Sequence, residues 1–124
     1  MRALRACSIA IAAAGLLAFS PRWACAHAFP ASEQPMVGAT VDAAPAEVEI
    51  RFDNPIEAMF GHLQVFNGSG ADVTSGPPSV SKDGITLSVQ LKPLAPGDYT
   101  VKWSVVAEDS HRTEGSYTFT VSGH

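Results

Sequence analysis

The sequence YTVKWSV, residues 99–105, alternates apolar and polar side chains along its whole length. Successive side chains of an extended strand point to opposite faces of a sheet, so this alternation is typical of a strand that buries one face. Three further segments repeat the pattern: EVEIRF (47–52), ITLSVQL (85–91) and YTFTV (117–121). After residue 26 no stretch of the sequence has the period of an amphipathic helix. The sequence therefore predicts an all-β domain.

Weaker apolar patterns, around residues 37–41 and at 63–65, predict two more strands, for a total of about six or seven. Turn-forming residues separate the segments: Ala44-Pro45, Asn67-Gly68-Ser69-Gly70, Gly76-Pro77-Pro78, Asp83-Gly84 and Pro96-Gly97. The Gly/Ser/Pro-rich stretch 75–79 is expected to be a mobile turn. The sequence LAPGDY (94–99) is similar to a tyrosine corner, in which a tyrosine hydroxyl bonds back to the preceding crossover. These features favour an immunoglobulin-like β-sandwich.

Residues 1–26 have the composition of a secretory signal. Two arginines near the start precede an apolar stretch over 9–19, and Ala24-Cys25-Ala26 follows it. The apolar stretch is shorter than the roughly 20 residues that a membrane-spanning helix needs, so we expect cleavage after Ala26 and no membrane anchor. The alternative, a lipoprotein acylated on its cysteine, is disfavoured because Arg22 stands where such signals have an aliphatic residue. The predicted mature domain, residues 27–124, would work in an oxidising compartment outside the cytoplasm.

The composition of the predicted mature domain narrows its function. It has 98 residues, enough for one domain, and five basic residues against twelve acidic ones, so nucleic acid is not an expected partner. Cys7 and Cys25 leave with the signal, which excludes a disulfide and a thiolate ligand. The mature sequence contains neither a cysteine nucleophile nor a Gly-x-Ser-x-Gly motif, and we expect a monomer that is not an enzyme.

The residue that cleavage would expose, His27, offers two metal ligands at once. Its free α-amine and its imidazole Nδ1 can close a six-membered chelate ring around one ion. Nitrogen ligands in a plane suit Cu(II), which stands at the top of the divalent affinity order. The amine must lose a proton to bind, and such amines ordinarily titrate near pH 8, so metal and proton compete near neutrality.

A second group of candidate ligands is Asp109-Ser110-His111. If this segment is extended, its i, i+2 spacing places Asp109 and His111 on one face. The amine, two imidazoles and a carboxylate oxygen would then form a four-ligand copper site, while the alternative is an ordinary surface loop. A soft Cu(I) site at Met59 and His62 is a weaker hypothesis, because two residues do not complete a coordination sphere.

The chain resembles the CopC family of periplasmic copper-resistance and copper-carrier proteins over essentially the whole predicted mature domain. The matching motifs recur in order: His27, Ser32-x-x-Pro35-x-x-Gly38, Ala44-Pro45, Val48-Glu49-Ile50-Arg51-Phe52, Leu94-x-x-Gly97-x-Tyr99, Val101-x-Trp103 and Asp109-x-His111-x-x-x-Gly115-x-Tyr117-x-Phe119-x-Val121. The resemblance implies a seven-stranded, cupredoxin-like Greek-key β-sandwich or barrel that holds Cu(II) through His27, Asp109 and His111. It also implies a role in copper homeostasis, and an inner-membrane transporter of the CopD type as a partner.

The sequence departs from the family at two places. The stretch 65–78 has no methionine, so a methionine-rich Cu(I) loop is not expected. After Phe52 several members carry Ser-Glu, whose carboxylate lies near copper, whereas this chain has Asp53-Asn54. A shift of one residue on a strand turns a side chain to the other face, so neither residue is predicted to be a ligand, although Asn54 stays a candidate hydrogen-bond donor beside the site.

Two rival functions follow from the same residues. An amine with two histidines is also the ligand set of lytic polysaccharide monooxygenases, yet the short chain leaves little room for an extended substrate surface, and Asp109 would occupy a position that oxygen chemistry needs open. A metal-free immunoglobulin-like interaction module is the other rival. The carrier hypothesis is the one we take forward.

Overall fold

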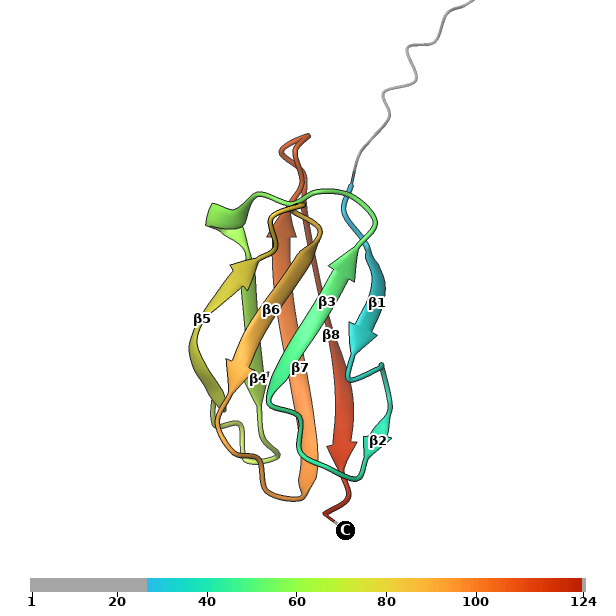
Figure 1. Ribbon diagram of the computed structural model, residues 1–124, viewed down its shortest axis with the longest axis vertical. Coiled ribbons are helices and arrows are strands. Elements are labelled where there is room, and N and C mark those ends of the chain that lie inside the picture. Colours follow the sequence, from blue (N-terminus) through green and yellow to red (C-terminus); the bar gives the residue numbers. More distant parts are fainter. Residues whose placement is uncertain (1–26, 124) are drawn as a thin grey trace, which may run out of the picture.

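The computed structural model describes residues 27–123 of the chain as a sandwich of two β-sheets (Figure 1). The predicted signal, residues 1–26, lies outside the described residues. The elements are β1 (Pro30–Gln34), β2 (Thr40–Val41), β3 (Glu47–Phe52), η1 (Ala58–Phe60), β4 (His62–Phe66), β5 (Thr74–Val80), β6 (Thr86–Leu91), β7 (Gly97–Val106) and β8 (Arg112–Val121). One sheet has the order β1-β3-β6-β5 and the other β2-β8-β7-β4. The predicted all-β, two-sheet fold is confirmed, with eight strands where the sequence predicted six or seven.

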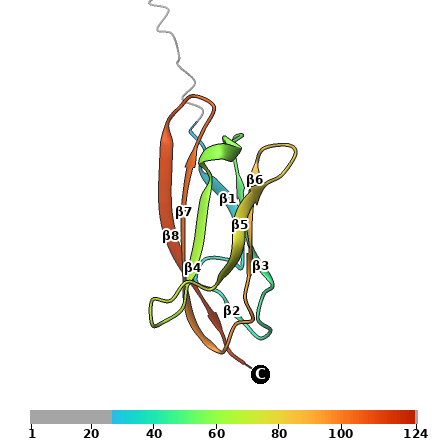
Figure 2. The ribbon, with the colours of Figure 1, turned by 90° about the vertical axis from the view of Figure 1, so that its left-hand side faces the viewer.

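The core fills the space between the two sheets, which face each other in the side view (Figure 2). Each strand of the central pairs, β3 with β6 and β7 with β8, turns its apolar positions inward, as the alternation predicted. The largest fully buried side chains are Phe52, Phe119, Ile50, Leu63 and Leu87. Burial of a side chain of this size contributes about 1.5–3 kcal/mol, so each of these positions is important for the fold's stability.

Two strands of the first sheet were not predicted. The stretch 74–80, expected to be a mobile turn in part, is strand β5 and pairs with β6 in antiparallel register. Its register shifts between Ser75 and Ser79, where Gly76-Pro77-Pro78 lies. Proline cannot donate a backbone hydrogen bond and is tolerated at a bulge on an edge strand, which is the position of β5. The other missed strand, β1, is also an edge strand and is mostly exposed, so it lacks the alternation of a half-buried one.

The predicted tyrosine corner is present at the start of β7. The Tyr99 hydroxyl donates a hydrogen bond to the carbonyl oxygen of Ala95 in the crossover from β6. The ring of Tyr99 is buried and stacks on Phe119 of β8, with ring centroids 5.4 Å apart. The corner therefore fixes the crossover between the two sheets to the core.

A second buried tyrosine, Tyr117, lacks such a bond. Its hydroxyl finds no hydrogen-bond partner among residues 27–123. Burial, together with the negative charge of Glu33, raises the pKa of Tyr117 above its ordinary value, so the hydroxyl stays protonated. A buried hydroxyl without a partner costs about 1–3 kcal/mol of desolvation.

Substitution of the two tyrosines by phenylalanine is expected to change stability in opposite directions. Tyr99→Phe loses a hydrogen bond and should lower the free energy of unfolding by about 1 kcal/mol, while Tyr117→Phe removes an unpaired polar atom and should raise it by about 1 kcal/mol. Urea unfolding followed by fluorescence checks this, because Trp103 is the single tryptophan of residues 27–124. Changes of the same sign would contradict the assignment.

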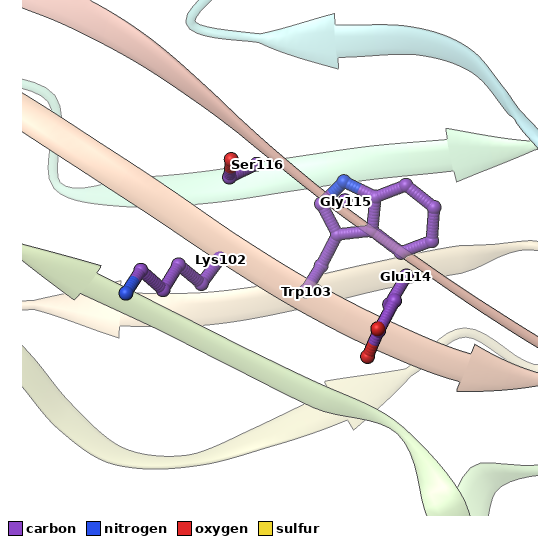
Figure 3. A pocket seen from close by; sticks show the side chains of 5 residues that line it. All are labelled: Lys102, Trp103, Glu114, Gly115 and Ser116. Carbon is purple, nitrogen blue, oxygen red and sulfur yellow. The ribbon is translucent and has the colours of Figure 1, made fainter.

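The indole of Trp103 packs over a glycine of the neighbouring strand. Trp103 of β7 pairs with Gly115 of β8, and its indole lies against the Gly115 backbone. Both residues line a shallow surface depression together with Lys102 and Glu114 (Figure 3). The indole meets the ring of Phe52 edge-on, with centroids 5.4 Å apart. A side chain at position 115 would occupy the place of the indole, since a Cβ built there lies 2.8 Å from the Trp103 ring.

Three segments far apart in the sequence meet at one end of the sandwich. The start of the described chain at residue 27, the segment from β3 to η1 and the hairpin connecting β7 to β8 lie together at the upper end in Figure 1. Ile56 bridges to Ala107 and the Glu57 N–H bonds to the Val106 carbonyl, so the second and third of these segments are tied together. Within residues 27–123, no helix has the length and apolar character needed to cross a membrane.

Candidate metal centre

Three side chains with metal-binding groups gather at this end of the sandwich: His27, Asp109 and His111. The Oδ2 atom of Asp109 lies 3.3 Å from Nδ1 of His27 and 3.0 Å from Nδ1 of His111. The two imidazole rings are perpendicular, with centroids 4.5 Å apart. All three predicted residues are therefore brought together, and they form the only such cluster of histidine and carboxylate groups in the part of the chain that the structure describes.

Asp109 and His111 are placed by a tight turn at the tip of the β7–β8 hairpin. The Ser110 N–H bonds to the Ala107 carbonyl at 2.9 Å, and the Ala107 N–H bonds to the His111 carbonyl at 3.0 Å. Ser110 has a φ of 70°, a left-handed conformation that is uncommon for residues other than glycine. The expectation that an extended segment aligns the two ligands is therefore wrong, because the chain reverses direction between them.

The turn also orients the carboxylate of Asp109. Its Oδ1 atom accepts a hydrogen bond from the backbone N–H of His111 at 3.0 Å, an arrangement that aspartate commonly makes two residues ahead of itself in turns. The other oxygen, Oδ2, is left to face both imidazoles. The Asp-x-His spacing thus works through a side-chain-to-backbone bond rather than through strand alternation.

The cluster is acidic at its centre and open on one side. The hydrogen bond from the His111 backbone N–H lowers the pKa of Asp109; desolvation opposes this, and the side chains of His111 and His27 lower it further. The carboxylate is therefore ionised at neutral pH and ready to accept a cation. The side chain of His111 is 59% exposed and that of His27 33%, so an ion can approach from solvent.

The chain next to His27 is held by three different parts of the fold. The side chain of Ala28 is fully buried, and its carbonyl accepts a hydrogen bond from Thr113 Oγ1 at 2.7 Å. The carbonyl of His27 accepts one from Asn54 Nδ2 at 2.9 Å. The Phe29 N–H donates to Asp53 Oδ1 at 2.8 Å, and the Phe29 carbonyl accepts from the Asp53 N–H at 2.9 Å.

These contacts place Asp53, Asn54 and Thr113 beside the site, and the sequence had not indicated the positions of Asp53 and Thr113. Neither Asp53 nor Asn54 contacts the candidate ligand atoms of the cluster; both bond to the backbone of the segment that carries His27. Asn54 is a hydrogen-bond donor there, as the sequence left open. Thr113 gave no signal, because it lies 85 residues from its partner and only the fold brings the two together.

The weaker hypothesis of a site at Met59 and His62 gains no support from the geometry. Met59 on η1 is 84% exposed, and His62 begins β4, where it is exposed and pairs with Ser104 of β7. Neither residue belongs to the cluster of His27, Asp109 and His111. The exposure of His62 agrees with an ordinary surface loop, whereas Met59, which such a loop was expected to pack, lies in solvent.

The fold and the cluster together define a small β-sandwich protein with a candidate metal centre at one end. Residues 31–122 match the family model of the CopC domain, which covers most of the chain. The chain belongs to the CopC family, and the relatives below carry names of copper transport and copper resistance.

One relative is a Bacillus subtilis copper transport protein, CutJ, 33% identical over 107 residues that cover 85% of this chain but 20% of CutJ. The chain thus spans about a fifth of that relative. Among solved structures, CopC from Methylosinus trichosporium OB3b is 29% identical with a TM-score of 0.74, and covers 79% of this chain and 96% of its own. PcoC from Escherichia coli, a methionine-rich copper-resistance protein, is 27% identical with a TM-score of 0.68, covering 77% and 99%.

Proposed function

We propose that the protein is exported, is cleaved after Ala26, and binds one Cu(II) ion in the periplasm through His27, Asp109 and His111. The observation that carries the proposal is the convergence of these three residues, with Nδ1 of His27 turned toward the Asp109 carboxylate. Nδ1 is the ring nitrogen that closes a six-membered chelate with the α-amine of the same residue. Cleavage after Ala26 would therefore add a fourth ligand to the three already assembled.

The donor chemistry favours Cu(II) over the softer Cu(I). Two imidazoles, an amine and a carboxylate form a set of nitrogen and oxygen ligands, which suits a tetragonal Cu(II) site. The cluster is made of two histidines and an aspartate, whereas Cu(I) prefers sulfur ligands. The structural neighbour PcoC is described as a methionine-rich copper-resistance protein, whereas this chain has only three methionines.

The role that fits such a site is to buffer copper or to deliver it to a membrane transporter of the CopD type, without enzymatic turnover. The exposed His111 leaves one side of the centre accessible to a receiving protein. The carboxylate of Asp109 supports binding rather than oxygen chemistry, because it faces both imidazoles and would take a coordination position at the ion. We propose that the protein acts as a monomer.

Titration of the purified protein 27–124 with Cu(II) tests this function. We expect tight binding of one equivalent, an electron paramagnetic resonance spectrum of tetragonal Cu(II) with nitrogen ligands, and no sustained oxygen consumption with ascorbate and a polysaccharide. His62→Ala serves as the control, since this exposed histidine lies outside the cluster. Sustained turnover would favour a copper monooxygenase, and weak binding that His27→Ala and His111→Ala leave unchanged would favour a metal-free interaction module.

A further inference from the structure

The residue that carries the proposed chelate is the first one of the predicted mature chain, and a chain terminus is ordinarily mobile. Here the backbone is fixed immediately after it. The carbonyl of His27 is bonded to Asn54, the carbonyl of Ala28 to Thr113, and the amide and carbonyl of Phe29 to Asp53. Residues 27–29 are thus tied to both sheets: to the end of β3 through Asp53 and Asn54, and to β8 through Thr113.

These contacts differ in what they do for the fold. The bond from the Asp53 N–H to the Phe29 carbonyl continues the antiparallel pairing of β1 with β3, which begins at Pro30 and Phe52, so it is part of the sheet. The Asp53 carboxylate caps this end of the pairing by accepting a bond from the Phe29 N–H. The bonds of Asn54 and Thr113 lie outside that ladder. Each of these side chains reaches across to a single carbonyl on the segment that carries His27.

We propose that Asn54 and Thr113 are positioning residues that act as a clamp: they hold the first peptide units of the mature chain so that His27 meets Asp109 and His111 before copper arrives. This inference rests on the proposed function and deepens it. The bond from Asn54 fixes the carbonyl of the chelating residue itself, and the bond from Thr113 fixes the next one. A site whose ligands are already ordered loses less conformational entropy on binding, so it binds more tightly and releases the ion more slowly.

The clamp is separable from the stability of the domain. Ala28 stays anchored by its buried methyl group, and the β1–β3 pairing remains, when either side-chain bond is removed. Neither Asn54 nor Thr113 is among the buried residues of the core. Loss of the clamp should therefore loosen His27 without unfolding the sandwich.

The chain offers well-matched variants for the test in the protein 27–124. Thr113→Val removes the hydroxyl at nearly constant volume, Thr113→Ser retains it, and Asn54→Leu removes the amide without adding charge. Thr120→Val is the control, because Thr120 also lies on β8 and its hydroxyl also makes one bond, to Asp98 Oδ1 at 2.8 Å, near the opposite end of the strand.

We expect Thr113→Val and Asn54→Leu each to weaken Cu(II) binding about 10-fold, within the 10- to 100-fold range typical of residues that orient metal ligands. The loss of affinity should come from faster dissociation of Cu(II). Thr113→Ser, which keeps the hydroxyl, should bind Cu(II) as tightly as the unmodified protein. The double variant should lose more and should give a broadened paramagnetic resonance spectrum, because the chelate samples several geometries. Thr120→Val should bind as the unmodified protein does, and the metal-free thermal midpoints of the clamp variants should fall no further than that of Thr120→Val.

Three results would overturn the inference. If the unmodified protein binds Cu(II) tightly and both clamp variants bind equally well, the clamp is absent while the proposed function stands. If affinity falls only in proportion to a loss of metal-free stability, the two residues are structural. If the unmodified protein itself binds no Cu(II), the proposed function fails, and the clamp fails with it.

Discussion

A protein 27–124 whose α-amine is blocked by acetylation is expected to bind Cu(II) at least about 100-fold more weakly than the protein with a free amine, a loss of about 2.7 kcal/mol. Acetylation turns the amine into an amide, which is no longer a ligand without losing a further proton, and so it opens the proposed chelate ring at His27. The imidazole, Asp109 and His111 remain in place, because the acetyl group changes no contact among them.

The block has to be an acetyl group rather than extra residues. A short extension would place a new α-amine within chelating reach of the His27 imidazole, and this could replace the lost ligand. His111→Ala is the matched comparison, since it removes one ligand from the opposite side of the cluster and should cost a similar factor. Competition against a chelator of known affinity measures the Cu(II) affinity of the free-amine protein, the acetylated protein and His111→Ala. Equal affinity of the acetylated and free forms would contradict the proposed role of the amine.

Gly115→Val is expected to lower the free energy of unfolding by about 3 kcal/mol, a large part of the 5–15 kcal/mol typical of a domain. The glycine faces the indole of Trp103, and a Cβ atom at this position would lie 2.8 Å from the ring. The indole cannot move inward freely, because the ring of Phe52 lies against it. Valine would therefore push the indole out of its place, which costs more than the gain in strand propensity returns.

The test uses urea unfolding followed by circular dichroism, since the substitution disturbs the fluorescent residue itself. Gly68→Val is the control: a Cβ there meets its nearest atom at an ordinary 3.9 Å, so the loss should be much smaller. In a Trp103→Phe background the cost of Gly115→Val should shrink, because the smaller ring leaves room. An undiminished cost in that background would place the strain elsewhere.

The strands that the sequence predicted are those whose side chains separate a buried face from an exposed one. The predicted stretches 47–52, 99–105 and 117–121, and 85–91 from Thr86 onward, lie in strands that bury alternate positions. The two edge strands of the first sheet escape this reasoning: β1 is held by backbone pairing, and β5 has a register shift at its glycine and prolines. Neither buries a regular face, so neither leaves a period in the sequence.

The candidate site could be predicted only in part for a related reason. Residue chemistry and family resemblance pointed to His27, Asp109 and His111, and the fold brings them together. The predicted extended geometry of 109–111 was wrong, because serine seldom adopts the left-handed conformation that Ser110 has, so nothing in the sequence indicated the turn. The contacts of Asn54 and Thr113 with the first residues depend on packing across the whole chain, which no local pattern encodes.

The cluster joins the two ends of the domain in sequence, since 82 residues separate His27 from Asp109. If the chain is exported from its amino end, as proposed, His27 crosses the membrane before the β7–β8 hairpin, so the three groups could not meet until the hairpin had crossed as well. Non-local contacts of this kind also form late and slowly in folding. An ion bound there would stabilise only the finished fold, by mass action, and would leave incomplete chains unmetallated. Copper loading would then report that the whole domain has been delivered and folded.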